Sequence, residues 1–236
     1  MDLQIRQGSR EAIPLFFDFI ASKISNWAGW VDKELADNDF FGCLVHASIL
    51  KSVARTRNLE GFLNFKGFRH LVPHWSPSLH TFFFFVDELI ITLEDMVNTS
   101  LLMFGDERPL NIQLSTEDLV VKEKLFKHFG GHTTSPEGKL ARIGRWVKAL
   151  SDKEKSVRQA MFIALWLSKF LFSEFPGYRI KSVFFPLAIC ITRGISYPLV
   201  PMFLGHLYSQ LDLVHADELA GNSCYTISSS LQCTML

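Results

Sequence analysis

The chain has 236 residues, 48% of them hydrophobic, which is enough for one large domain or two small ones with a sizeable core. Its 24 lysines and arginines balance 24 aspartates and glutamates, so the formal net charge of +0 excludes a global field that would favour a polyanion. The 4 cysteines form no CxxC pair and no compact framework, which indicates reduced thiols in an intracellular compartment.

The sequence predicts neither a signal peptide nor a transmembrane segment. The first apolar run, residues 13–20, is interrupted by a proline and an aspartate. The two most apolar regions are residues 160–172, broken by Lys169, and residues 183–204, which contain Arg193 and several prolines. We therefore expect buried helices in both regions.

Before Pro73, apolar residues recur at three- and four-residue steps, the period of amphipathic helices. This spacing predicts one helix from Arg10 to Trp30, ended near Gly29, and a second from Phe40 to Arg57. A short third helix is expected from Glu60 to Leu71, where the following proline stops it.

The segment at about residues 81–92 predicts a small β-hairpin. An aromatic, β-rich run from Thr81 to Val86 precedes Asp87-Glu88, which suits a two-residue turn. A second short β-branched run then extends from Leu89 to Thr92.

Thr92 has the side chain and the position of a helix N-cap. Asp95 follows three residues later, so each side chain can bond a backbone N–H that would otherwise lack a partner. Ile91 and Met96 flank this capping box as a hydrophobic staple. A core helix is therefore expected to start directly after the hairpin.

A second capping box predicts a helix in the middle of the chain. Ser115 and Asp118 cap a helix from about Thr116 to Phe129, stapled by Leu114 and Leu119, and Gly130-Gly131 closes it.

Two further helices are expected before residue 173. The apolar positions between Leu140 and Leu150 form one helical face. Ser151 and Glu154 then cap a helix whose apolar content rises from Val157 to Phe172, and we expect this helix to be central to the core.

After Tyr178, prolines separate the apolar stretches, so several short helices are expected, one of them from Phe203 to Leu213. The segment from Asp217 to Leu236 contains weak helix formers. Together the elements predict a mainly α fold: a single multi-helix globular domain with one small β-hairpin leading into a capped helix.

Histidines are the first candidates for chemistry. His70, His74 and His80 crowd the start of the hairpin, but Pro73 breaks the helical geometry that a four-residue step needs for zinc. His128 and His132 straddle the glycine pair that ends their helix. No metal site is predicted.

The carboxylates Glu88, Glu94 and Asp95 are candidates for acid–base chemistry. Asp95 is explained as a cap, and Glu94 lies in the first helical turn, where the helix dipole favours a negative charge. No GxSxG, P-loop or GxGxxG motif is present. The residues therefore predict no catalytic group and no cofactor site.

One stretch of the chain is rich in basic residues: Lys139, Arg142, Arg145, Lys148, Lys153, Lys155 and Arg158. Three acidic residues interrupt it, which favours a solvated face over a nucleic-acid groove. Nucleic-acid binding stays open as an alternative.

The hairpin and capped helix carry a family resemblance. The residues Thr81, Phe82, Phe84, Glu88, Thr92, Leu93, Glu94 and Asp95 resemble the THTFxFPxGExTxTLEDV signature of the plant mobile domain, also called the aminotransferase-like plant mobile domain. Similar flanks are Trp75-Ser76-Pro77, Phe104-Gly105-Asp106, Ser196-Tyr197-Pro198 and the segment from Leu204 to Tyr208. Asp87 replaces the usual glycine before Glu88, so the hairpin is expected to differ slightly.

The resemblance covers roughly residues 27–236, after an N-terminal helix or extension over residues 1–26. The family tends to continue beyond the Gly221 region, so an incomplete C-terminus is expected here. MAIN-like (maintenance of meristems) and transposon-derived members imply a nuclear protein linked to transposon silencing, genome stability and meristem development. A phosphatase-like or silencing factor is the implied protein partner.

The resemblance and the residues together favour a non-enzymatic interaction module or scaffold. The label "aminotransferase-like" leaves a pyridoxal-phosphate enzyme as an alternative, which would need a Schiff-base lysine, a cation site for the phosphate and a carboxylate for the ring nitrogen. Spacing identifies none of these groups.

Overall fold

A computed structural model describes residues 16–18, 24, 26–58, 70–85, 87–102, 105, 112–130, 143–173, 179–220 and 224–226. Over these residues the fold is mainly α, with nine α-helices and a small three-stranded antiparallel sheet. The predicted single mainly helical domain with one hairpin is thus confirmed.

The N-terminal region differs from the prediction. Phe16–Asp18 forms a short strand, β1, where a helix was expected, and it pairs in parallel with β5 (Cys224–Thr226). Helix α2 (Trp27–Leu35) contains Gly29, which was expected to end a helix. A Cβ on Gly29 would lie 2.5 Å from the side-chain oxygen of Asn26, so this glycine makes room for a neighbour and does not terminate the helix.

The second predicted helix, from Phe40 to Arg57, is two helices, α3 (Asn38–His46) and α4 (Leu50–Thr56). Ser48 between them has a positive φ of 61°. The Ile49 N–H bonds the Leu44 carbonyl at 3.1 Å and the Ser48 N–H bonds the Val45 carbonyl at 2.9 Å, the two bonds of a Schellman motif. The apolar period continues across the break because Leu44 and Ile49 are both buried.

The predicted hairpin is present, within a sheet of order β2-β3-β4: Trp75–Ser76, Thr81–Phe83 and Glu88–Ile90. The predicted Asp87-Glu88 turn is wrong. Glu88 pairs with Phe83 inside the sheet, and the Phe84 N–H donates to the Asp87 carbonyl at 2.8 Å, so the connection runs from Phe84 to Asp87. Most of the third predicted helix, residues 60–71, lies outside the described residues; a 3-10 turn, η1 (Val72–His74), precedes β2.

Helices α6 (Leu93–Ser100) and α7 (Thr116–Gly130) begin at the predicted capping boxes, and α8 spans Ile143–Leu150. The predicted Ser151 cap is wrong. Helix α9 (Lys155–Trp166) has Glu154 at its N-cap without a side-chain bond, while the Ser151 hydroxyl donates back to the Lys148 carbonyl at 3.2 Å.

The core centres on α9 and the π-helical turn η3 (Leu167–Leu171) that continues it, as predicted. Every side chain from Gln159 to Ser173 is buried. Trp27 stacks on Phe162 with ring centroids 5.0 Å apart, and Trp146 stacks on Phe185 at 5.6 Å, so α2, α8 and α10 are fixed around α9.

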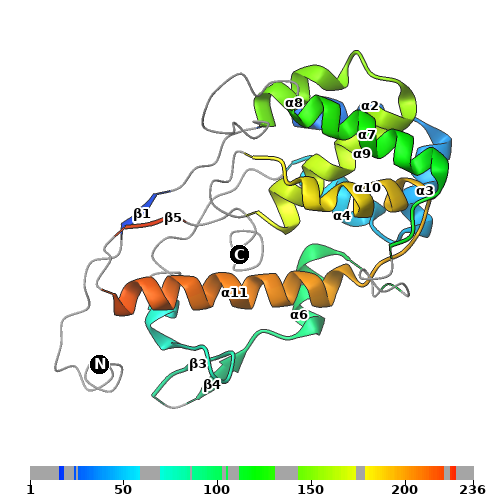
Figure 1. Ribbon diagram of the computed structural model, residues 1–236. Helices are drawn as coiled ribbons and strands as arrows, with labels where there is room; N and C mark the ends of the chain where they lie inside the picture. Colours follow the sequence, from blue (N-terminus) through cyan, green and yellow to red (C-terminus); the bar gives the residue numbers. More distant parts are fainter. Residues whose placement is uncertain are drawn as a thin grey trace.

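The last third holds η4 (Ser182–Phe184), α10 (Phe185–Thr192) and α11 (Leu199–Leu219). Helix α11 is much longer than predicted, because Pro201 lies in its first turn, where backbone N–H groups have no intrahelical partner. In Figure 1, α11 runs between the helices α7 to α10 on one side and the β3–β4 hairpin on the other. It packs against α6, η1 and β2, the elements that precede and follow the β3–β4 hairpin.

Candidate functional site

The predicted box at the start of α6 is formed. The Asp95 N–H donates to the Thr92 hydroxyl at 3.2 Å, while the Thr92 N–H and hydroxyl both donate to the Asp95 carboxylate at 2.8 Å. These bonds, from the Thr92 backbone first and its hydroxyl second, lower the pKa of Asp95. Both residues are thus engaged in starting a helix.

The other carboxylates of this segment take no part in the capping box of α6. Glu88 is exposed on β4 and Glu94 is exposed in the first turn of α6. The Asp87 carboxylate accepts a bond from the Glu88 N–H at 2.9 Å. Each of these carboxylates has a separate local environment, and within the described residues no two of them contact each other.

The apolar members of the signature form the inner face of the sheet. Phe82 is buried between Trp75 and Leu89, its cross-strand neighbours, and its ring centroid lies 4.9 Å from that of Trp75. Thr81 is also buried, whereas Leu93 at the start of α6 is partly exposed. The aromatic run is therefore mainly a packing element.

Trp75 is bound to α11 by a polar contact that the sequence did not reveal. Its indole Nε1 donates to Asp212 Oδ1 at 2.8 Å, across 137 positions of sequence. His80 is close to the same carboxylate, since its Nε2 lies 3.8 Å from Asp212 Oδ2. The backbone of His80 has a positive φ of 53°. The His80 ring also stacks on Tyr208 at 4.7 Å.

Tyr208 connects α11 to the start of α6. Its hydroxyl donates to the Ile91 carbonyl at 2.5 Å, directly before the capping box. Burial, and second the negative charge of Asp95, raise the pKa of Tyr208. Tyr208 and Asp212 are four residues apart on one helical face, which is the signal that could have paired them.

Gly105 brings two flanking motifs together. A Cβ at this position would lie 2.0 Å from the carbonyl oxygen of Tyr197 and 2.7 Å from its Cα. Gly105 and the segment Ser196-Tyr197-Pro198, far apart in sequence, therefore meet where only glycine fits.

The candidate histidines that the structure describes form no metal-binding cluster. His74 packs its ring against Phe84 at 4.6 Å, and its buried Nδ1 has no hydrogen-bond partner among the described atoms. The part of the chain that the structure describes contains no group of three or more His, Cys, Asp or Glu side chains arranged to hold a metal ion. His132 lies outside that part.

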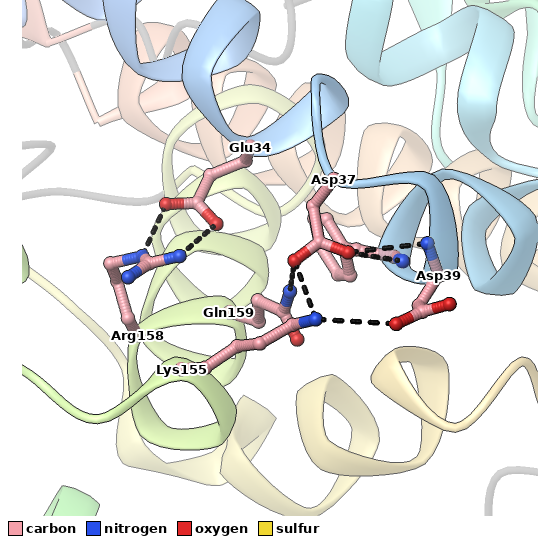
Figure 2. A network of polar contacts seen from close by, with 7 residues as sticks. Glu34, Asp37, Asp39, Lys155, Arg158 and Gln159 are labelled. Atoms are coloured by element: carbon pink, nitrogen blue, oxygen red, sulfur yellow. Dashed lines mark hydrogen bonds and ion pairs between the residues drawn. The ribbon is translucent and has the colours of Figure 1, made fainter.

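Two cations of the basic stretch, Lys155 and Arg158, are engaged in ion pairs. Figure 2 shows the Arg158 guanidinium paired with the Glu34 carboxylate and the Lys155 ammonium paired with the Asp37 carboxylate. The N–O distances are 2.6 Å and 2.7 Å. Lys155 also lies 3.4 Å from Asp39. The two C-terminal cations of the stretch thus join α9 to α2 and α3, while Lys139 and Arg142 lie outside the described residues.

This network is partly buried. Glu34 is 0% exposed in its side chain and Arg158 is 19% exposed. The side-chain bond from Lys155 is the main cause that lowers the pKa of Asp37, and the same bond raises the pKa of Lys155. Asp37 also accepts bonds from the Asp39 and Phe40 N–H groups as the N-cap of α3, so structure accounts for all these charges.

One lysine stands out by its burial. Lys169, in η3, is the buried lysine of the described residues and is surrounded in sequence by buried positions of the core. The sequence had marked it only as a break in an apolar run. No helix in the described part of the chain combines the length and the apolar character needed to cross a bilayer.

The fold and these contacts define a mainly helical domain whose small sheet and capped helix are bound to one long helix. The family model for the plant mobile domain matches residues 64–234, most of the chain. The chain therefore belongs to the plant mobile domain family, as the signature predicted. Neither a search of curated proteins nor a search of solved structures gave a match.

Proposed function

We propose that this plant mobile domain is a non-enzymatic protein-interaction domain, a scaffold in a plant nuclear complex linked to transposon silencing, genome stability and meristem development. The observation that carries the proposal is how the signature residues are used. Those with reactive side chains are engaged in capping or lie exposed and apart, whereas several apolar side chains of the same segment, outside the buried aromatic positions, lie open to solvent.

The exposed apolar side chains belong to the hairpin and to the residue that follows the cap. Phe85 is fully exposed, Leu89 and Ile90 are about half exposed, and Leu93 is partly exposed. Exposed apolar residues gathered on one rigid element are typical of a protein-binding surface. We expect the partner to be a phosphatase-like protein or a silencing factor, as the family suggests.

Affinity purification of the intact chain from plant nuclei tests the proposal. We expect reproducible enrichment of a phosphatase-like or silencing factor over a tag-only control, followed by binding of the two purified proteins. A chain that is excluded from nuclei and recovers no such factor would contradict the proposal.

A cofactor test separates this function from the enzyme alternative. Purified protein mixed with pyridoxal phosphate is expected to give no borohydride-sensitive aldimine absorbance band. Such a band, lost on replacing Lys169 with methionine but retained when exposed Lys148 is replaced, would favour the enzyme.

A further inference from the structure

The outer edge of β4 is available for strand pairing. β4 ends the sheet order β2-β3-β4, and Glu88, Leu89 and Ile90 are all exposed. Phe84 and Asp87 form a hydrogen-bonded pair, so by the antiparallel alternation Glu88 and Ile90 direct their backbone groups away from β3. The Asp87 side chain already bonds the outward Glu88 N–H.

The inner face of the sheet is incompletely covered at this edge. Trp75, Phe82 and Leu89 form one cross-strand row whose exposed fractions are 0%, 1% and 51%. Helix α11 packs against β2, whereas Leu89 on β4 is half open to solvent. An added strand would extend this row and bury the rest of Leu89.

The layer of the fold that contains β4 carries acidic residues but no lysine or arginine. Residues 70–105 and 199–220, which hold the sheet, α6 and α11, contain no lysine or arginine. Their acidic residues are Asp87, Glu88, Glu94, Asp95, Asp212, Asp217 and Glu218. The capping bonds lower the pKa of Asp95, so its negative charge is maintained near neutral pH.

We propose that the outer edge of β4 binds an extended segment of a partner protein in which lysines or arginines alternate with apolar residues. The segment pairs its backbone with the Glu88 carbonyl and with Ile90, packs apolar side chains against Leu89, and places cations near the acidic residues. This inference rests on the proposed interaction function and specifies its surface and the chemistry of its partner.

Charge complementarity also favours a basic peptide over a second copy of the chain or a nucleic acid. A second copy pairing through the same edge would bring the acidic hairpins together, and like charges across a strand pair are destabilising. A nucleic acid would meet a layer without a single lysine or arginine. A basic, β-forming peptide is complementary in both backbone and charge.

Fluorescence anisotropy at low salt tests the proposal with the full chain. The probe is a labelled, end-capped peptide of about ten residues in which lysine and valine alternate, a length that exceeds a typical strand. Two control peptides replace lysine by glutamate or group the lysines and valines in blocks. We expect binding of the alternating lysine peptide, weakened by added salt.

Two variants examine backbone pairing and charge. Ile90→Pro removes an outward N–H at an edge position that tolerates proline and should weaken binding about tenfold or more. Glu88→Lys should weaken it about fivefold, whereas Glu123→Lys, the same charge change on exposed α7, should leave it unchanged. Near-UV circular dichroism and urea unfolding confirm that each variant is folded; Glu88→Lys retains the test if Ile90→Pro unfolds.

The proposal is overturned by absent binding, by equal binding of the glutamate or block peptide, or by equal binding of folded Ile90→Pro. Dimerisation of the wild type that Ile90→Pro abolishes would assign the edge to a second copy and overturn it too. If a nuclear partner is recovered equally by the wild type and Ile90→Pro, the interaction function stands and this surface is wrong. Recovery of none by either removes the interaction function itself.

Discussion

Replacing Thr92 with alanine tests the structural role of the signature most simply. The change deletes the hydroxyl that accepts from the Asp95 N–H at 3.2 Å and donates to the Asp95 carboxylate at 2.8 Å. The bond from the Thr92 N–H to Asp95 remains. Loss of a threonine N-cap typically costs about 1 kcal/mol, and the exposure of both residues favours that central value.

Urea unfolding followed by circular dichroism measures this loss of stability. We expect Thr92→Ala to lower the unfolding midpoint without changing the slope, which scales with the surface exposed on unfolding. Thr92→Ser, which keeps the hydroxyl, should retain most of the stability. A Thr92→Ala protein as stable as the wild type would show that the Thr92 hydroxyl does not stabilise the start of α6.

The cost of Thr92→Ala should also depend on pH. Because folding lowers the pKa of Asp95, the stabilisation by its carboxylate is fully present above the unfolded pKa, about 3.9, and is lost as pH falls through the lower folded pKa. The stability difference between wild type and Thr92→Ala should therefore shrink between about pH 7 and about pH 3. A difference that grows on acidification would contradict this.

Three further substitutions test contacts that hold the domain together, each by urea unfolding. Gly105→Ala places a Cβ against the Tyr197 backbone and should cost at least about 2 kcal/mol; wild-type stability would refute the close approach. Arg158→Met leaves the charge of buried Glu34 uncompensated and should cost about 3–5 kcal/mol, most of it recovered by adding Glu34→Leu. Tyr208→Phe loses one hydroxyl bond and should cost about 1 kcal/mol, so a neutral result would argue against that bond.

Local signals in the sequence predicted the local features well. The boxes at Thr92 and Ser115 need only residues three positions apart, and both are formed. Ser151 failed although it shows the same spacing, because its hydroxyl bonds the preceding helix and α9 begins after Glu154. A capping pattern does not reveal which of two adjacent helices will use the hydroxyl.

Contacts between distant segments could not be predicted from one sequence. Trp75 and Asp212, or Gly105 and Tyr197, meet only after the chain has folded. The break at Ser48 was missed because the Schellman turn keeps the apolar period intact on both sides. Total charge also concealed an important feature, since the net value of +0 averages a layer free of lysine and arginine with a basic remainder.

The most direct test of the proposed interaction function is quantitative affinity purification from plant nuclei with the wild-type chain and folded Ile90→Pro in parallel. We expect the wild type to enrich a phosphatase-like or silencing factor through a basic, extended segment, and Ile90→Pro to lose it. Absence of any such factor from the wild-type sample would contradict the claim that this plant mobile domain is an interaction domain.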